Sequence, residues 1–215
     1  MLEMAFYDGI RHMVATPHYI TGTYETKADE IREKTDVLNS HAQKRGMDIT
    51  IYAGQEINAD AQSFSALAAG ELLTLNNSKY ALIEIDPQLT DESIKNALEA
   101  VFEMGMIPVI AHAERLLASG RNIDMIFRLF ERGTIIQVNA DSIKGDAGTN
   151  LKRNAHLLLK KGLVHAVSSD CHSPAWRPPA LSVAEKEVKR ICGGEQTKKL
   201  MYINPYKIIS NKDLV

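Results

Sequence analysis

Histidines and carboxylates recur along this chain, each at or near the end of a short apolar run. Taken singly, a glutamate at such a position is usually a solvated loop residue, and a buried histidine is usually a hydrogen-bonded core residue. A ligand-type residue at the end of nearly every apolar run is hard to obtain by chance. Imidazole and carboxylate together suit Zn, Mn or Fe better than Ca or Mg, which prefer oxygen ligands alone. The sequence therefore predicts a multi-metal site, with these candidate ligands: His18, Glu56, Glu84, His112, Asp170 and His172.

Two arginines lie close to these ligands. Arg115 is three residues past His112, and Arg177 is seven past Asp170. A guanidinium fork is suited to phosphate, although a surface salt bridge is the ordinary role of such a residue. Around Arg177, Trp176 and nearby prolines favour a stiff, shaped loop. Metals with arginines indicate a phosphoester substrate, whose phosphoryl oxygen a metal would polarise while activated water attacks in line.

A second phosphate chemistry competes with the metal hypothesis. Cys171 to Arg177 has the C-x5-R spacing of a cysteine-dependent phosphatase, in which a thiolate attacks phosphorus. Such a loop binds phosphate with successive backbone N–H groups. Here Pro174 removes one N–H, and no glycine lies between Cys171 and Arg177. We therefore rank this hypothesis below the metal site.

The elements that must position these residues alternate between strands and helices. Apolar positions at helical spacing end at a glycine four times, at Gly46, Gly105, Gly133 and Gly162. Alternation of this kind predicts a parallel sheet covered by helices, and in a β/α barrel all strand ends share one rim where sites are built. The predicted strands are HMVA (12–15), ITIYAG (49–54), YALIEI (80–85), IPVIA (107–111), TIIQV (134–138) and VHAVS (164–168).

The beginning of the chain departs from this alternation. LEMAFYDG (2–9) has the pattern of the last turns of a helix, and no strand precedes it. Because an open parallel edge exposes unpaired backbone groups, we expect a first strand to be missing upstream of Met1. The four remaining histidines, at predicted strand starts or on helices, are expected to be structural or solvated: His12, His41, His156 and His165.

Composition limits the class of protein. The chain has 215 residues, which fits one domain over 1–215, and 45% of them are hydrophobic and 24% charged. Its net charge of −2 argues against a general nucleic-acid binder. No apolar run is long enough to span a bilayer, no signal peptide is evident, and two cysteines do not make a disulfide scaffold. We expect a cytoplasmic protein without membrane insertion.

The ordered motifs resemble the polymerase-and-histidinol-phosphatase superfamily (PHP). Within it, the chain is most similar to the bacterial tyrosine phosphatases of capsule and exopolysaccharide operons, the CpsB/YwqE type. The resemblance covers essentially the whole chain. The motifs that carry it are ATPH (15–18), GQE (54–56), IEI (83–85), HAER (112–115), QVNADS (137–142), SSDCH (168–172) and Arg177.

This resemblance implies a distorted (βα)7 barrel that holds three metal ions, commonly manganese. By position, Glu56, Glu84 and His112 would bind one metal. His18 and His172 would bind another, with Asp170 in the cluster. The resemblance implies that Arg115 and Arg177 bind phosphate. The implied substrate is the phosphorylated tyrosine-rich tail of a partner tyrosine autokinase that controls polysaccharide synthesis.

One family feature is absent. The family opens with a strand ending in His-x-His, and no His-x-His occurs in this sequence. We expect the chain to be much less active than a longer one that carries such a strand. Three alternatives stay open beside a tyrosine phosphatase: a histidinol-phosphate phosphatase, a phosphotyrosine-binding remnant without turnover, and the cysteine mechanism. Metal identity and oligomeric state also stay open.

Overall fold

The chain folds into two compact units, in a computed structural model that describes residues 1–214. Unit 1 comprises Met1–Ile10 and His112–Tyr206. Unit 2 comprises Arg11–Ala111 and the residues from Lys207 onward.

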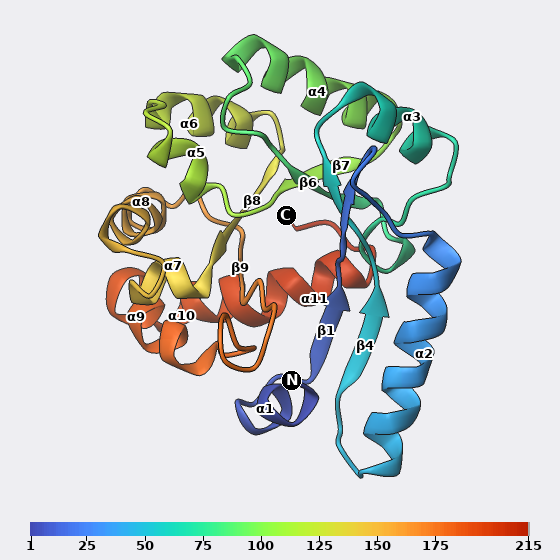
Figure 1. The fold of residues 1–215 in the computed structure, drawn as a ribbon. Helices are drawn as coiled ribbons and strands as arrows, with labels where there is room; N and C mark the ends of the chain where they lie inside the picture. Colours follow the sequence, from blue (N-terminus) through green and yellow to red (C-terminus); the bar gives the residue numbers. More distant parts are fainter. Residues whose placement is uncertain (215) are drawn as a thin grey trace. The chain divides into compact units, whose positions relative to one another are not determined.

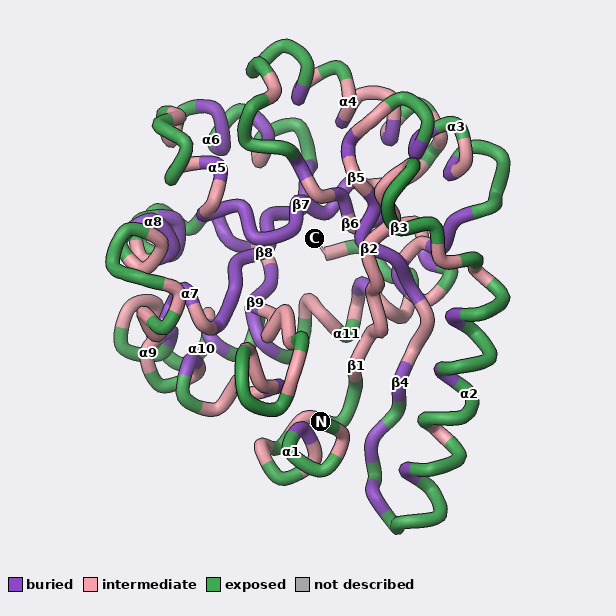
Figure 2. The backbone as a smooth tube through the Cα atoms, viewed as in Figure 1, coloured by how far each residue is buried: buried purple, intermediate pink, exposed green. Residues whose placement is uncertain are grey.

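Parallel strands form the centre of unit 2. β1 pairs with β4, and four further strands follow in the order β2-β5-β6-β7, all parallel. A short β3 pairs antiparallel with β2 at the edge. Figure 2 labels all of these strands, and Figure 1 labels β1, β4, β6 and β7. Their bounds are β1 His12–Ala15, β2 His18–Ile20, β3 Tyr24–Glu25, β4 Thr50–Ala53, β5 Glu56–Asn58, β6 Tyr80–Glu84 and β7 Ile107–Ile110.

Two of the predicted strands are each continued by a second short strand. The β1–β4 ladder passes into the β2–β5 ladder through two backbone hydrogen bonds, from Gly54 N to the Ala15 carbonyl (3.0 Å) and from Glu56 N to the Pro17 carbonyl (3.1 Å). A Cβ on Gly54 would lie 2.8 Å from Cγ1 of Val14, so a larger residue would separate the two strands. His18 and Glu56 therefore begin strands of their own, where the sequence predicted positions at or near the ends of the preceding strands.

Helices cover the strands of unit 2. α2 contacts β4, and α4 contacts β7 (Figure 1). Thr90 caps α4 by accepting a hydrogen bond from Ser93 N, and α4 ends before Gly105, whose φ is 74°. The helices of this unit are α2 Ala28–Lys44, α3 Ala61–Ala68, α4 Asp91–Glu103 and a 3₁₀ turn at Leu75–Asn77.

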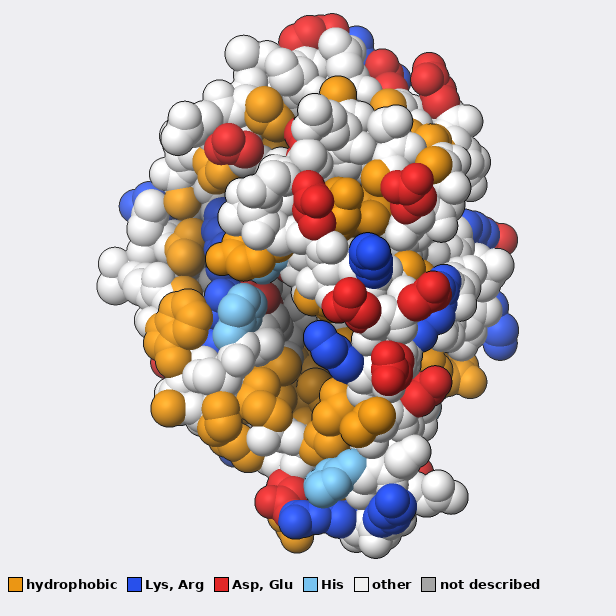
Figure 3. All heavy atoms as spheres, turned by 45° about the vertical axis from the view of Figure 1, so that its right-hand side comes forward, with side chains coloured by type: hydrophobic (Ala, Val, Ile, Leu, Met, Phe, Trp, Pro, Cys, Tyr) orange, Lys and Arg blue, Asp and Glu red, His pale blue; other side chains and the backbone are white. Residues whose placement is uncertain are grey.

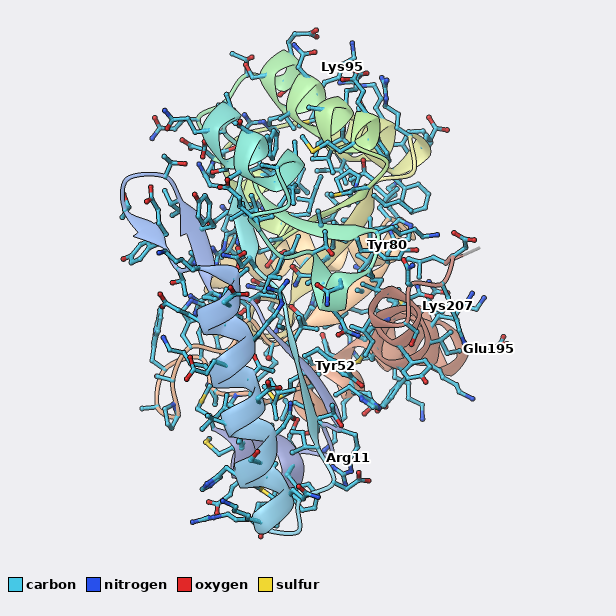
Figure 4. The ribbon with its side chains drawn as sticks, turned by 90° about the vertical axis from the view of Figure 1, so that its right-hand side faces the viewer. Arg11, Tyr52, Tyr80, Lys95, Glu195 and Lys207 are labelled. Carbon is cyan, nitrogen blue, oxygen red and sulfur yellow. The ribbon has the colours of Figure 1, made fainter. Side chains whose placement is uncertain are left out.

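The last residues of the chain are anchored to unit 2 by hydrogen bonds. The Tyr80 hydroxyl donates to the carbonyl of Lys212 (2.8 Å), and Lys79 N donates to Oδ1 of Asn211 (2.8 Å). Figure 4 labels Tyr80 and Lys207 at this place. These bonds hold the C-terminal segment near the start of β6.

Unit 1 is built around two parallel strands. β8 (Ile135–Asn139) pairs with β9 (Ala166–Ser168), with Gln137 opposite Ala166 and Asn139 opposite Ser168. All five residues of β8 are buried, as the purple tube in Figure 2 shows. Strands buried on both faces are typical of parallel sheets covered by helices.

The helices of unit 1 pack around these strands. α8 contacts α5, α7 and α9 (Figure 1). Leu158 on α8 and Ile126 on α6 are fully buried, and burial of such a side chain contributes about 1.5–3 kcal/mol. The bounds are α1 Leu2–Tyr7, α5 Glu114–Ala118, α6 Ile123–Glu131, α7 Ala140–Lys144, α8 Thr149–Lys160, α9 Ser182–Cys192, α10 Gly194–Lys198, a π-helical turn at Lys199–Ile203 and α11 Asn204–Ile209, which runs into unit 2.

These features confirm a mixed α/β fold with parallel strands. They also confirm the helix predicted within residues 2–9 and the four glycines predicted to end helices, all of which have a positive φ. The face in Figure 3 intersperses acidic, basic and apolar side chains, in agreement with the small net charge. Within residues 1–214, no helix combines the length and the apolar character that crossing a bilayer requires.

Candidate metal centre and phosphate-binding residues

Three predicted ligands meet in unit 2. The structure brings one ligand atom each of His18, Glu56 and Glu84 within 4.8 Å of one another. His18 and Glu56 are paired in register at the start of β2 and β5, and Glu84 is the last residue of β6. Nδ1 of His18 lies 3.2 Å from Oε2 of Glu84. Residues 66 positions apart in the chain thus form one compact donor set.

This donor set fits a divalent cation. Two carboxylates this close repel each other, and a cation between them relieves the repulsion. One imidazole nitrogen with two carboxylate oxygens is the ligand mixture of Zn, Mn and Fe sites. Glu56 is buried at 5% exposure, whereas His18 and Glu84 are half-buried. The set is therefore partly shielded from water and still accessible to an incoming ion.

In unit 1, three of the predicted residues, Arg115, His172 and Arg177, gather around Asp170. Its Oδ2 accepts hydrogen bonds from Nη1 of Arg177, from Nη2 of Arg115 (3.4 Å) and from Nδ2 of Asn139 (2.7 Å). His172 donates from Nδ1 to the Asp170 carbonyl (2.9 Å), and its Nε2 accepts from Nη2 of Arg177 (3.1 Å). One aspartate thus fixes both predicted phosphate-binding arginines.

Three residues of this unit have left-handed backbone conformations. The φ angles are 36° for His112, 46° for Asp170 and 54° for Arg177. Each such non-glycine residue costs about 1–3 kcal/mol and persists only where its surroundings fix it. Here His112 N donates to Oε1 of Gln137 (2.6 Å), and His172 N donates to the Arg177 carbonyl (2.9 Å). Strain of this kind clusters at functional sites.

A buried amide network supports both His112 and Asp170. Gln137 is 5% exposed and Asn139 is fully buried. Nε2 of Gln137 donates to Oδ1 of Asn139 (2.8 Å) and to Oγ of Ser168 (2.7 Å). These residues lie in the motifs QVNADS (137–142) and SSDCH (168–172), but no role was predicted for Gln137 or Ser168. The available signal was the alternation of polar and apolar residues in QVN (137–139), which places both amides on one face of β8.

Glu114 is a buried carboxyl beside this network. It is fully buried at the start of α5, and burial raises its pKa above the ordinary value for glutamate. Its Oε1 accepts a hydrogen bond from Asn139 N (3.3 Å), and its carbonyl accepts one from Nδ2 of Asn154 (3.2 Å). Glu114 therefore joins α5 to β8 and α8.

The cysteine mechanism receives no support from the surroundings of Cys171. Cys171 is half-buried, and burial raises the pKa of its thiol, which favours the protonated form at neutral pH. A cysteine-dependent phosphatase needs a thiolate. Moreover, the guanidinium of Arg177 contacts the carboxylate of Asp170. The surroundings of Cys171 and Arg177 therefore favour the metal hypothesis over the cysteine mechanism.

The other histidines occupy structural or surface positions, as predicted. His12 hydrogen-bonds with the Tyr52 hydroxyl (3.2 Å), and Nε2 of His156 with the carbonyl of Ile143 (3.0 Å). His165 stacks on Phe130 with ring centroids 4.7 Å apart, and burial lowers its pKa to about 4.

Comparison with known proteins places these residues in a family context. A sequence model of the family described as "Capsular polysaccharide synthesis, CpsB/CapC" matches residues 1–210. The chain is 32% identical over 216 residues to the tyrosine-protein phosphatase CpsB of Streptococcus agalactiae, covering 98% of this chain and 89% of the relative. It is 34% identical over 194 residues to the tyrosine-protein phosphatase YwqE of Bacillus subtilis, covering 87% and 75%.

A solved structure agrees with these matches. It is described as one of YwqE from Bacillus subtilis and CpsB from Streptococcus pneumoniae, "unique metal-dependent tyrosine phosphatases". The match has a TM-score of 0.91 at 30% identity and covers 100% of this chain and 87% of the other. By its sequence and its fold, the chain belongs to the CpsB/CapC family of capsular polysaccharide synthesis.

Proposed function

We propose that this chain is a metal-dependent protein-tyrosine phosphatase that hydrolyses phosphotyrosine. The observation that carries the proposal is the donor set of His18, Glu56 and Glu84, whose ligand atoms lie within 4.8 Å of one another. The named relatives, which are tyrosine-protein phosphatases, support the choice of substrate.

The metal ligands are the six predicted from the sequence. His18, Glu56 and Glu84 hold an ion in unit 2, and His112, Asp170 and His172 supply the ligands of unit 1. Mn²⁺ is the ion we propose first, with Fe and Zn as alternatives that the same donors accept. When bound, such an ion polarises a phosphoryl oxygen and lowers the pKa of water.

The arginines bind the phosphoryl group. Arg115 and Arg177 converge on Oδ2 of Asp170, so this carboxylate holds both guanidinium groups with their remaining N–H donors available to phosphate oxygens. Among the residues that the structure describes, the buried Nε of Arg177 has no hydrogen-bond acceptor. Leaving a buried donor unsatisfied costs about 1–3 kcal/mol, so the position of Arg177 is maintained at a cost in stability.

The finer properties follow from the family resemblance. We propose that residues 1–215 act as one phosphatase domain with a distorted (βα)7 barrel. The substrate is the phosphorylated tail of a partner tyrosine autokinase in capsule or exopolysaccharide synthesis. Because such a kinase takes its phosphate from ATP, the encounter takes place in the cytoplasm.

A substrate panel tests the proposal. The purified chain with added Mn²⁺ is assayed on a phosphotyrosine peptide and, in parallel, on histidinol phosphate. We expect turnover of the peptide, loss of turnover with a chelator, and recovery when Mn²⁺ is restored. Preference for histidinol phosphate would reassign the substrate. If the metal-loaded protein binds phosphotyrosine but does not hydrolyse it, the chain is a phosphotyrosine-binding protein and not a phosphatase.

A further inference from the structure

The loop between β9 and α9 carries an exposed tryptophan beside a phosphate-binding arginine. Trp176 is 66% exposed, whereas tryptophan is on average a highly buried residue. Cζ of Arg177 lies 4.6 Å from the centroid of the indole ring. We propose that Trp176 is a specificity-determining residue that stacks on the aromatic ring of the phosphotyrosyl substrate. This inference rests on the proposed function.

The loop holds the backbone of Trp176 in place before any substrate binds, and the indole contacts Arg177 and the His172 ring. Trp176 N donates to Oγ of Ser173 (2.9 Å), and the same hydroxyl donates to the Trp176 carbonyl (2.7 Å). His172 N donates to the Arg177 carbonyl (2.9 Å), which closes the loop on both sides of the tryptophan. Three prolines restrict the backbone further, namely Pro174, Pro178 and Pro179.

The far end of the loop is also fixed. The carboxylate of Asp8, in the first segment of unit 1, accepts hydrogen bonds from Leu181 N and from Ser182 N (3.0 Å) at the start of α9. This contact is an N-cap supplied from a distant part of the chain. A surface that is ordered in advance loses little conformational freedom on binding, so its contacts contribute fully to affinity.

The position of the indole matches the chemistry of the substrate. In phosphotyrosine a single ester oxygen joins the phosphorus to the aromatic ring, so the ring must lie within a few ångströms of the arginine that binds the phosphate. Trp176 occupies such a position next to Arg177, and the His172 ring meets it edge-on at 6.0 Å. Aromatic rings stack favourably at centroid distances of about 4.5–7 Å. Phosphoserine has no ring to place there.

The alternative to stacking on the substrate is that the indole only positions Arg177 through the cation–π contact. The two roles differ in their dependence on the ligand. A positioning role affects every ligand that uses Arg177, including inorganic phosphate. A stacking role affects only ligands that carry an aromatic ring.

Steady-state kinetics on Trp176→Leu and Trp176→Phe separate these roles. For Trp176→Leu we expect the KM for a phosphotyrosine peptide to rise about fivefold to tenfold, while the inhibition constant of inorganic phosphate stays within twofold. For Trp176→Phe we expect a KM close to that of the wild type, because phenylalanine keeps an aromatic ring. Phe127→Leu, an exposed aromatic residue on α6, is the matched control and leaves both constants unchanged. An equal rise in both constants, or no rise in KM, overturns the proposal.

A second measurement does not depend on turnover. Trp176 is the single tryptophan of the chain, so intrinsic indole fluorescence reports on it directly. At constant metal concentration, we expect phenyl phosphate to quench this fluorescence, with a much smaller effect of inorganic phosphate. Quenching without hydrolysis would refute the proposed phosphatase activity but retain the stacking. Equal effects of the two ligands would refute the stacking even in an active enzyme.

Discussion

Arg177 donates a hydrogen bond to the carboxylate of Asp170, and both residues have left-handed backbone conformations. The same carboxylate oxygen also accepts from Arg115 and Asn139. Asp170 thus holds the guanidinium groups of Arg115 and Arg177 and the side-chain amide of Asn139. It is also one of the proposed metal ligands.

We expect Asp170→Asn to lower kcat/KM for a phosphotyrosine peptide by about 10²–10³-fold, a loss of the size that follows removal of one preorganised electrostatic contact. The amide has no charge to hold the two guanidinium groups. The control is Asp146→Asn, which removes an exposed carboxylate paired with Lys144 and should leave kcat/KM unchanged. An active Asp170→Asn variant would contradict the central place of this carboxylate.

Glu56→Gln tests the metal site of unit 2. An amide oxygen is a weaker ligand than a carboxylate, so we expect at least about a tenfold loss of Mn²⁺ affinity, measured by metal titration and by the metal content of the purified protein. Glu71→Gln, at an exposed position of the same unit, is the matched control. Equal metal affinity in both variants would count against the donor set of His18, Glu56 and Glu84.

The sequence predicted the helices α2, α4, α6 and α8, because their signals are local, but it did not predict α3, α5, α7 or the helices after β9. Apolar spacing with a terminal glycine defines each of the four predicted helices, and Gly105 and Gly133 have the positive φ that such stops require. The sequence also predicted that His18, Glu56 and Glu84 lie together, because parallel strands deliver their terminal residues to one edge.

What the sequence could not predict depends on contacts between distant residues. The close approach of Gly54 to Val14, near the point where β1 gives way to β2, joins positions 40 residues apart in the chain. The hydrogen bond from Gln137 to Ser168 joins positions 31 residues apart. Nothing in either local segment specifies such a partner. For the same reason, spacing alone did not show that Asp170 pairs with the arginines.

The buried side-chain amide of Asn139 should contribute to the stability of the fold. Asn139→Ala removes one donor to Asp170 and the acceptor of Gln137, and a lost buried hydrogen bond that leaves its partner unsatisfied costs about 1–3 kcal/mol. We expect this loss in the free energy of unfolding measured with urea. Asn150→Ala, which removes an exposed contact with Arg153, should change it by less than about 0.5 kcal/mol.

Cys171→Ser should retain activity. Burial raises the pKa of this thiol, so it is not the ionised nucleophile that a cysteine mechanism needs. We expect at least about half of the wild-type kcat, with unchanged sensitivity to a chelator. Inactivation by this substitution together with resistance to chelation would establish the opposite mechanism.

His165 should make stability depend on pH. Its pKa is lowered to about 4 by burial, so as the pH falls below about 6.5 the unfolded chain binds a proton that the folded chain does not. The free energy of unfolding is therefore fully retained above pH 6.5. Protonation of this group lowers the free energy of unfolding by about 3 kcal/mol between pH 6.5 and 4.

The variant His165→Gln tests this prediction. It keeps an acceptor for Ile136 N, which donates to Nδ1 of His165 (3.0 Å), and it removes the titrating group. We expect this variant to show a shallower loss of stability toward pH 4 in urea unfolding, whereas His41→Gln, an exposed substitution on α2, should follow the wild type. Parallel curves for His165→Gln and the wild type would mean that other groups govern the acid sensitivity of the fold.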